Sequence, residues 1–483
     1  MLNKRQRDKG FSKSKSGPVI LDKVKFAFYL KKKYGFLLKP DGMWLKYSKG
    51  AFREITEREV LAIAMNEIVT DFPECYSINA EKTYLGALEN LCFCKKKLNS
   101  HKNLINLKNG MFNIDTEELL PHDMKYLSTI QLNIEYDKEA ECPLFKKFLM
   151  NIFAKNKKLC GVVQEIMGYC LYPDTPAHKF FLFYGTGGNG KSVLINILIA
   201  LVGKGNYSTV PIRDLSRIFS RIELKDKALN ISSENESMNG KRFDSQNIKA
   251  IASGDTISAE HKGKQAVNFK PFCKLIFSVN TLPSISDKSE GLMRRMVIIP
   301  FEKSYSIDDG TADIHLEEKL KAEMAGIFNL AVRGLKHLQK NDFRFTKCKK
   351  IEEYLNEFER LINPYMLFWE ECIEFVEDDE DIQRTLKTDV YNEFINWAND
   401  NKYIYLAKVT QKKFWQEFKA TAKKMCGSSL KEGKSNKYRY ITNIRLKNEV
   451  GNCVYKYYKI RNTPVKSNTI DLSEGNSYED DEE

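Results

Sequence analysis

A glycine-rich stretch near the middle of the chain has the residue types and spacing of a phosphate-binding loop. In "GTGGNGKS", residues 185–192, the pattern G-x-x-x-x-G-K-[ST] is met at all four fixed positions. In such a loop the lysine reaches the β and γ phosphates of a nucleotide, and the last hydroxyl binds Mg²⁺. The pattern predicts a site for a nucleoside triphosphate with Mg²⁺, formed by Gly185, Thr186, Gly187, Gly188, Asn189, Gly190, Lys191 and Ser192.

The segments on either side of this loop fit the prediction. Phe180 to Tyr184 is an apolar run typical of a buried strand, and "SVLINILIALVG" has the apolar spacing of a helix that ends at Gly203. A strand, a glycine loop and a helix direct backbone N–H groups and the positive end of the helix toward a polyphosphate. The alternative is a glycine turn that binds no ligand.

Acidic and amide side chains follow two later strands. A short strand, Ala228 to Ser232, leads to Glu234 and Glu236, although Asn230 is an unusual residue for a buried strand. A carboxylate at a strand end can hold the Mg²⁺ shell and polarise the attacking water. We assign this role to Glu234, with Glu236 or a solvated acidic turn as alternatives. The strand "KLIFSVN" ends at Asn280, whose amide could orient water or simply serve in a turn.

Two arginines stand directly before another apolar strand, in "GLMRRMVIIPF". An arginine that stabilises the charge developing on a transferred phosphoryl group is a recurrent part of nucleotide hydrolysis sites. Arg294 or Arg295 could supply that charge, but paired arginines also occur as ordinary surface residues.

Between the acid and the amide, the sequence predicts a hairpin with a basic tip. Ile257 to Glu260 and Gln265 to Phe269 alternate like strands, and the connection contains His261, Lys262 and Lys264. A basic tip can hold phosphates without distinguishing bases. Lysines also keep an edge hairpin soluble, which is the alternative.

The order of these motifs resembles that of the superfamily 3 helicases. The chain contains, in sequence, the glycine loop, the strand-end glutamate, "IKAIASGDTIS", the basic hairpin, "KPFCKLIFSVNTLP" and "RRMVIIPF". Within that superfamily it is similar to the phage and plasmid primase-helicase family, which is related to the poxvirus-type enzymes. The segments "INLKNGMFNIDTEELLPHD", "VQEIMGYCLYP" and "EMAGIFNLAVRGL" also resemble this family, so the likeness covers about residues 100–340.

The resemblance implies an AAA+ type motor that assembles as a ring, usually of six subunits, and moves on DNA while it hydrolyses ATP. By position, it implies that Lys191 binds phosphate, Glu234 is the catalytic acid and Asn280 is the sensor. Arg294 or Arg295 would be the arginine finger that reaches the neighbouring subunit. The hairpin residues that would face DNA are His261, Lys262 and Lys264.

Many relatives carry a primase domain ahead of the helicase. About 100 residues precede the region of resemblance here, without a paired-acid strand motif or zinc-ligand spacing. We therefore expect a helicase without primase, so that another protein must provide a primase if the replicon needs priming.

Composition favours a polyanionic partner. The 483 residues include 77 Lys and Arg against 64 Asp and Glu, a net charge of +13. No apolar run reaches the roughly 18 residues of a membrane span, and the N-terminus lacks the apolar core of a signal peptide. We expect a protein without membrane contact in the cytoplasm of a bacterial host. The 11 cysteines form no C-x-x-C pair, so we expect neither disulfides nor a zinc site.

Periodicity predicts an α/β protein with a central sheet and several parts. A hairpin should turn at Ser48 to Gly50, and Leu316 to Gln339 is the candidate lid helix. The predicted parts are a flexible basic arm (1–20), an N-terminal α+β domain (21–140), a helical collar (141–178), the ATPase core and lid (179–345), a winged-helix-like domain (365–465) and an acidic tail (466–483).

The winged-helix prediction rests on two amphipathic helices and a strand pair. "DVYNEFINWANDNKY" and "TQKKFWQEFKATAKKM" are the helices, the second capped by Thr410, and "YRYITNIRL" and "NCVYKYYKIR" alternate like strands. Such a domain would bind DNA by a helix in the groove and a wing on the backbone. Its candidate contacts are Lys412, Lys413, Lys437, Arg439, Lys456 and Arg461. The alternative is a helical interaction module with solvent-facing lysines.

Two functions of different class are consistent with these motifs. The first is an ATP-dependent ring helicase that unwinds DNA during replication of a phage, plasmid or mobile element, and that could also bind the origin. The second is an ATP-switched initiator that binds and melts an origin without processive unwinding. A small-molecule kinase would explain the glycine loop but gives no role to the hairpin, the arginine pair or the basic C-terminal domain.

Overall fold

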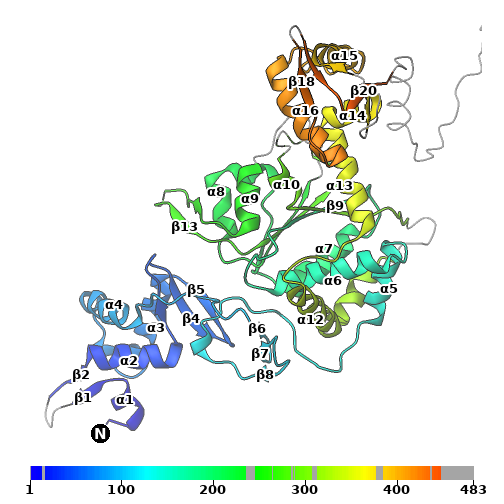
Figure 1. The fold of residues 1–483 in the computed structure, drawn as a ribbon. Coiled ribbons are helices and arrows are strands. Elements are labelled where there is room, and N and C mark those ends of the chain that lie inside the picture. Colours follow the sequence, from blue (N-terminus) through cyan, green and yellow to red (C-terminus); the bar gives the residue numbers. More distant parts are fainter. Residues whose placement is uncertain are drawn as a thin grey trace, which may run out of the picture. The chain divides into compact units, whose positions relative to one another are not determined.

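The computed structural model describes residues 2–13, 17–234, 245–263, 265–283, 285, 287, 289–306, 313–376, 384–435 and 438–447, with the backbone alone at Asn79, Ala80 and Glu234. Several predictions fall outside the described residues, namely those on Glu236, Lys264, Lys437, the segment "NCVYKYYKIR" and the acidic tail. The chain divides into two compact units, Met1–Phe358 and Glu359–Glu483 (Figure 1).

The first unit begins with short helices and hairpins around an apolar centre that includes Phe26, Leu30 and Trp44. These elements are α1 (Lys4–Asp8), β1 (Phe11–Lys13), β2 (Val19–Leu21), α2 (Lys23–Tyr34), β3 (Leu37–Leu38), β4 (Trp44–Ser48), β5 (Ala51–Ile55), α3 (Glu57–Val69) and α4 (Ile78–Cys92). Strand β4 pairs antiparallel with β5, and Gly50 between them has a φ of 85°. The predicted hairpin is therefore confirmed.

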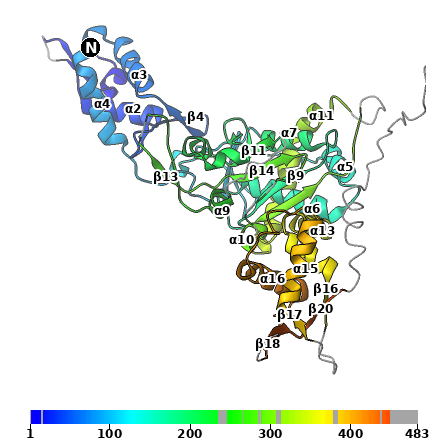
Figure 2. The ribbon, with the colours of Figure 1, turned by 90° about the horizontal axis from the view of Figure 1, so that it is seen from above.

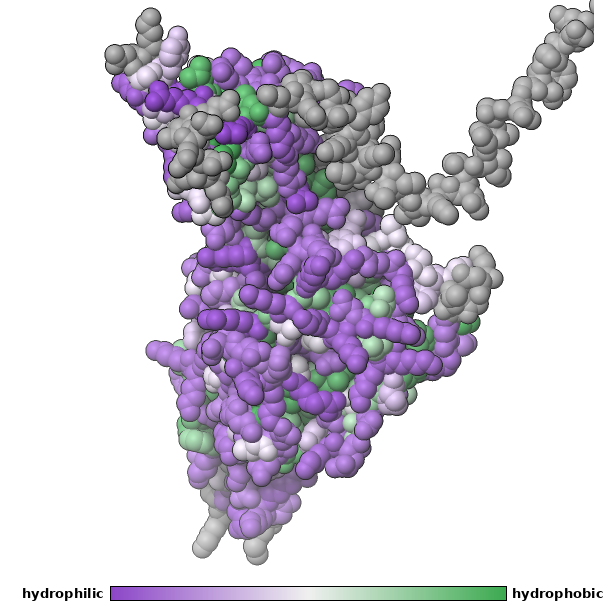
Figure 3. All heavy atoms as spheres, turned by 45° about the vertical axis from the view of Figure 1, so that its right-hand side comes forward, coloured by the Kyte–Doolittle hydropathy of each residue, from purple (hydrophilic) through white to green (hydrophobic). Residues whose placement is uncertain are grey.

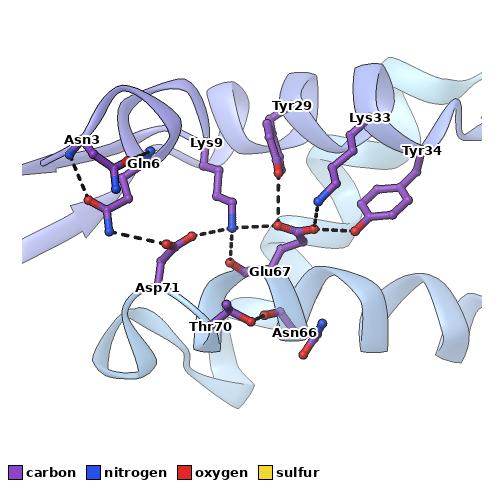
Figure 4. Close-up of polar contacts among 10 residues, drawn as sticks. All are labelled: Asn3, Gln6, Lys9, Tyr29, Lys33, Tyr34, Asn66, Glu67, Thr70 and Asp71. Carbon is purple, nitrogen blue, oxygen red and sulfur yellow. Dashed lines mark hydrogen bonds and ion pairs between the residues drawn. The ribbon is translucent and has the colours of Figure 1, made fainter.

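Residues 2–13 are ordered, in contrast to the flexible arm predicted for residues 1–20. The side chain of Lys9 is fully buried, and its ammonium group forms ion pairs with Glu67 (2.7 Å) and Asp71 (Figure 4). Glu67 also accepts hydrogen bonds from three further side chains, those of Tyr29, Lys33 and Tyr34. This network joins the end of α1 to α2 and α3. Sequence patterns could not reveal it, because its members are far apart in the chain.

Glu67→Gln is expected to destabilise the N-terminal region by about 3–5 kcal/mol, the scale on which loss of one partner of a buried ion pair acts. The amide would leave the ammonium group of Lys9 without a full counter-charge. Burial raises the pKa of Glu67, but hydrogen bonds from Lys33, Lys9 and Tyr34 outweigh it and lower this pKa to about 2. The carboxylate therefore contributes stability above the unfolded-state pKa of roughly 4.3, and this contribution is lost as the pH falls toward 2.

Urea unfolding at pH 7 and pH 3 measures this effect. The difference between wild type and Glu67→Gln should be smaller at pH 3. Glu57→Gln, which changes an exposed acid of the same helix, is the matched control. Equal stability of wild type and Glu67→Gln at pH 7 would contradict the prediction.

A five-stranded parallel sheet forms the centre of the first unit, and β11, β14 and β9 lie side by side in Figure 2. The strand order is β10 (Tyr207–Ser208), β11 (Leu229–Glu234), β14 (Lys274–Val279), β9 (Phe180–Tyr184) and β15 (Met296–Pro300). The strands predicted at Phe180 to Tyr184 and in "KLIFSVN" are confirmed. Residues of both faces are buried, as expected for a parallel sheet covered by helices.

Helices cover the sheet on both sides. The helices that share one apolar cluster with a face of the sheet are α5 (Pro143–Ile152), α6 (Lys157–Leu171), α7 (Lys191–Val202) and α12 (Met324–Lys340). In Figure 1, α6, α7 and α12 lie on one side of the sheet, and α9 (Ser245–Ser253) and α10 (Glu290–Met293) lie on the other. Gly168 and Gly334 let α6 and α12 approach closely, because a Cβ on either would lie within 2.4 Å of a backbone oxygen of the opposite helix.

Two segments that were predicted to be helical each form two helices. The collar segment forms α5 and α6, separated by Ala154 and Lys155 with φ of 49° and 62°. The lid segment forms α11 (Leu316–Ala322) and α12, separated at Glu323. The carboxylate of Glu323 accepts hydrogen bonds from the backbone N–H groups of Leu144 (3.1 Å) and Phe145 (2.9 Å) at the start of α5. This contact, together with the packing of α12 against α6, places the second half of the candidate lid in the core.

The remaining elements of this unit surround the sheet. They are η1 (Pro73–Cys75), β6 (Leu104–Leu107), β7 (Gly110–Asn113), β8 (Leu119–Leu120), η2 (Met124–Tyr126), η3 (Ile212–Ser216), α8 (Ile218–Arg221), η4 (Ile222–Leu224), β12 (Ile257–Ala259), β13 (Val267–Phe269) and most of α13 (Lys349–Ile362). Ile105 and Phe112 of the β6–β7 hairpin belong to the same apolar cluster as the sheet.

The second unit contains helices and two small antiparallel sheets. Its elements are α14 (Pro364–Cys372), β16 (Ile373–Phe375), β17 (Thr385–Leu386), α15 (Lys387–Asp400), α16 (Gln411–Cys426), β18 (Glu432–Lys434), β19 (Arg439–Ile441) and β20 (Ile444–Leu446). The two amphipathic helices are confirmed, and Thr410 caps α16 by accepting a hydrogen bond from the N–H of Lys413 (3.4 Å).

The segment "YRYITNIRL" is not one strand, as predicted, but two strands in different sheets. Strand β19 pairs with β17 and β18, whereas β20 pairs with β16. Asn443, which is buried between them, binds the backbone N–H of Lys431 (2.9 Å) and the carbonyl of Ser429 (3.1 Å). These bonds hold the chain in the bend.

Among the described residues, none of the helices is both long enough and apolar enough to cross a membrane. The face of the molecule in Figure 3 is mostly hydrophilic, and hydrophobic residues show only as small separate patches.

Candidate nucleotide-binding site

The predicted phosphate loop lies at the carboxyl edge of the parallel sheet, between β9 and α7. The neighbouring strands end at the same level, because Tyr184 pairs with Val279 and Pro300, and Val279 pairs with Glu234. Ligands of open α/β sheets bind outside the carboxyl ends of the strands. The register therefore brings the loop, the end of β11 and Asn280 to one edge of the sheet.

The loop depends on its glycines. Gly188 and Gly190 have φ of 69° and 81°, in the left-handed region that favours glycine. A Cβ on Gly185 would lie 2.4 Å from the carbonyl oxygen of Phe301, and one on Gly190 would lie 2.8 Å from the side chain of Ile152. The loop is thus held between the end of β15 and α5.

Lys191 is buried at the start of α7, where it contacts the carbonyl groups of its own loop. Its ammonium group donates hydrogen bonds to the carbonyl oxygens of Gly185 and Thr186 (3.2 Å) and to Oδ1 of Asn280 (3.4 Å). Burial lowers the pKa of Lys191 below its ordinary value. A phosphate beside the ammonium group would favour its charged form, so the arrangement suits an anionic ligand.

A cavity of about 660 Å³ opens beside the loop. Its volume lies in the range of sites for small molecules and cofactors. Exposed Ser192 contributes to its polar wall, together with Ser233, Ser278 and Asn280. One face of α5 forms another wall, with Leu144, Lys147, Phe148, Asn151 and Ile152. The hydroxyl of Tyr305, in the same lining, is buried without a hydrogen-bond partner, so a polar ligand could satisfy it.

The backbone of Glu234 ends β11 at this edge, as predicted, and its side chain is not among the described atoms. The unexpected polar residue of this strand, Asn230, is fully buried. Its Oδ1 accepts hydrogen bonds from Ser208 (2.8 Å) and the N–H of Val210 (2.9 Å), and its Nδ2 donates to the carbonyl of Val210 (3.0 Å). The amide side chain thus replaces backbone pairing beyond the short strand β10.

The arginine pair lies at the opposite edge of the sheet from the phosphate loop of the same chain. Both arginines precede Met296, which pairs with Phe180 at the start of β9, whereas the loop follows Tyr184 at its end. With about 3.3 Å per residue in a parallel strand, the two edges are roughly 13 Å apart. The geometry of the sheet thus separates the arginine pair from the phosphate loop of the same chain.

The two arginines differ in their surroundings. Arg294 is exposed. The guanidinium group of Arg295 donates hydrogen bonds to Oγ of Ser253 (3.0 Å) and to the carbonyl of Gly291 (2.6 Å). Lys179 donates to the carbonyl of Arg294, and burial, followed by the charges of Arg295 and Arg294, lowers the pKa of Lys179. These three cations form a cluster that an anion would stabilise.

The predicted basic hairpin is confirmed, since β12 pairs antiparallel with β13. It projects from the sheet in Figure 1, with His261 and Lys262 exposed at its tip. At its base, Nε of Arg221 donates a hydrogen bond to the carbonyl of Ser258 (2.9 Å). The hairpin therefore presents its cations on an anchored support.

In the second unit, the structure brings two of the predicted DNA contacts together. Lys412 in the first turn of α16 and Arg439 at the start of β19 line one groove of about 650 Å³. Lys413 is exposed outside this lining.

Sequence reasoning did not identify three contributors to these sites. The lining side chains of α5 had a signal, the spacing of three to four residues that places them on one helix face. Lys179 directly precedes an apolar strand, but a single cation in that position is not distinctive. Ser253 holds Arg295 across more than 40 residues of sequence, and no local pattern could indicate that contact.

Two families match separate parts of the chain. Residues 183–295 match a family described as "Family of unknown function (DUF5906)", and residues 20–154 match the family "D5 N terminal like". The second match begins well before the region of motif resemblance.

Curated relatives include two viral proteins. "Putative helicase L207/L206" of Acanthamoeba polyphaga mimivirus is 29% identical over 219 residues, which cover 43% of this chain and 22% of that protein. "Putative helicase 184R" of Invertebrate iridescent virus 6 is 26% identical over 257 residues, which cover 46% of this chain and 24% of that protein. The matched region thus spans less than a quarter of the length of either relative.

Solved structures of the C-terminal region of NrS-1 share the fold. One apo structure, of residues 305–718, has a TM-score of 0.52 at 14% identity and covers 86% of this chain and 97% of that chain. The A form apo structure has a TM-score of 0.51 with the same identity and coverage. Together with the order of the motifs, the two family matches and the viral relatives named as helicases support a member of the phage and viral primase-helicase family, and the solved structures support the fold.

Proposed function

We propose that this protein is an ATP-dependent DNA helicase of superfamily 3 that unwinds DNA during replication of a phage, plasmid or mobile element. One observation carries the proposal: a complete phosphate loop occupies one edge of the sheet, and an exposed arginine occupies the opposite edge. Viral relatives named as helicases and the net charge of +13 support DNA as the partner.

The residues at the loop would each have a separate role in ATP hydrolysis. Bound MgATP supplies the phosphoanhydride bond that is broken. With the nucleotide bound, Lys191 would leave the loop carbonyls and bind the β and γ phosphates, and Ser192 and Glu234 would hold Mg²⁺. Glu234 also polarises the attacking water, which Asn280 orients. The hydrogen bond between Lys191 and Asn280 supports this assignment, because it joins the two side chains to which these roles are given.

The position of the arginine pair favours a site shared between subunits. Arg294 cannot assist its own phosphate loop across the sheet, but it could reach the loop of a neighbour in a closed ring, with six subunits as the expected number. Arg295 donates hydrogen bonds to Ser253 and Gly291, which supports a positioning role for Arg295 and the role of finger for exposed Arg294.

DNA contacts complete the proposal. His261, Lys262 and Lys264 of the hairpin bind the phosphate backbone in the channel of the ring. In this account residues 179–345 form the AAA+ core, residues 141–178 the collar and residues 365–465 a winged helix.

Glu234→Gln is expected to bind ATP and Mg²⁺ but to hydrolyse ATP slowly, because the amide keeps the shape of the side chain and loses the charge that polarises water. Nucleotide binding and steady-state hydrolysis, measured separately, test this expectation. Glu236→Gln is the matched control, and a larger loss of hydrolysis in that variant would contradict the assignment of Glu234.

A further inference from the structure

The second unit has a groove that combines cations with aromatic rings. The groove of about 650 Å³ lies between the first turns of α15 and α16 and the start of β19. Its charged lining residues are Lys387, Lys412, Lys419 and Arg439, and none of the carboxylates that the structure describes lines it. Glu432 approaches only from outside this lining, where it pairs with Lys387 (3.1 Å) and Lys419 (2.7 Å). The groove therefore complements a polyanion.

Two aromatic side chains occupy the same groove. Tyr438 is 56% exposed, although a tyrosine ring usually gains stability from burial. The indole of Trp415 is fixed by an edge-to-face contact with Phe418, with ring centroids 5.4 Å apart. Nζ of Lys387 lies 4.3 Å from the centroid of the Trp415 ring, so a cation already rests against this aromatic surface. Aromatic rings beside cations can stack on the flat, neutral bases of a nucleic acid while the cations pair with its phosphates.

We propose that this groove binds single-stranded DNA, with bases stacked on Tyr438 and Trp415 and phosphates paired with Lys412 and Arg439. Proteins that bind single strands combine a basic groove with aromatic platforms in this way. A duplex fits less well, because its bases are stacked on one another and offer no free face to these rings. The choice of DNA over RNA rests on the proposed helicase function, whereas the preference for a single strand rests on the groove itself.

The experiment uses the full chain without ATP, so that it does not depend on hydrolysis. Fluorescence anisotropy compares binding of an oligothymidine and of a duplex of equal length. Tyr438→Ala should weaken binding of the single strand by about tenfold, within the range known for one base–aromatic stack, and should leave duplex binding unchanged. Tyr438→Phe should retain binding. Tyr405→Ala, which removes an exposed tyrosine of the same unit outside the groove lining, is the control and should have no effect.

Two further readouts separate this groove from other DNA contacts. An oligothymidine that carries one 5-iododeoxyuridine should crosslink, on irradiation, to peptides that contain Tyr438 or Trp415. Lys412→Ala should reduce the slope of log affinity against log salt by about 0.7 for the single strand, whereas Lys408→Ala, at an exposed lysine outside the groove lining, should not.

The inference is overturned if Tyr438→Ala binds the single strand as wild type does, if it weakens duplex binding equally, or if the crosslinks map elsewhere. These binding measurements are made without ATP, so they do not depend on ATP hydrolysis. A failure of the proposed helicase function would therefore be recognised separately, in the hydrolysis and unwinding assays.

Discussion

Lys191→Ala is expected to abolish ATP hydrolysis and to leave the fold intact. The ammonium group of Lys191 now contacts the carbonyls of Gly185 and Thr186, and it would stabilise the β and γ phosphates. Among the described residues that line the cavity, Lys147 on α5 is the other cation. Release of inorganic phosphate, measured with and without single-stranded DNA, should fall to the background of a protein-free sample.

Lys204→Ala is the matched control for this variant, because Lys204 is an exposed lysine just after the same helix, α7. It should hydrolyse ATP at the wild-type rate. Thermal unfolding of both variants checks that the fold is retained. Wild-type turnover in Lys191→Ala would refute the ATPase assignment.

Arg294→Ala is expected to bind ATP normally and to lose roughly three or more orders of magnitude in hydrolysis, the scale on which arginine fingers act. The loss should be partly rescued when Arg294→Ala is mixed with Lys191→Ala, because one mixed interface then combines an intact loop with an intact arginine. A surface arginine cannot produce such rescue. Turnover per subunit of the wild type should also rise with protein concentration as rings assemble.

Arg295→Ala is the variant with which Arg294→Ala is compared. Since Arg295 is held by Ser253 and Gly291, we expect a smaller loss that comes from displacement of Arg294. If both variants keep full activity, or if turnover per subunit stays constant at concentrations where only monomers are detected, the shared-site mechanism is wrong.

The elements nearest the phosphate loop were predictable from sequence because their signals are local. Four fixed positions define the loop, and the apolar strand and the glycine-ended helix beside it follow from residue type alone. The strand before Glu234 was also predictable in spite of Asn230. What the sequence could not show is that the amide of Asn230 is satisfied by Ser208 and Val210.

Features that depend on distant contacts were not predictable. Periodicity continues through the break in the lid segment at Glu323, so it indicated one helix there. The contact of the Glu323 carboxylate with the start of α5 joins residues that are almost 180 positions apart. The basic composition of residues 1–20 favoured a flexible arm. The contacts that order this segment could not be read locally, because the partners of Lys9, Glu67 on α3 and Asp71 just after it, lie about 60 residues away in the chain. The structure alone shows that Arg294 is exposed while Arg295 binds Ser253, because this contact joins residues that are distant in the sequence.

Strand displacement on forked DNA tests the central claim most directly. With ATP, wild-type protein should release the labelled strand, and it should fail to do so with a non-hydrolysable ATP analogue or when it carries Lys191→Ala. If ATP is hydrolysed but no strand is released, or if release is equal with the analogue, the protein is not an ATP-driven helicase, and the origin-melting initiator becomes the better account.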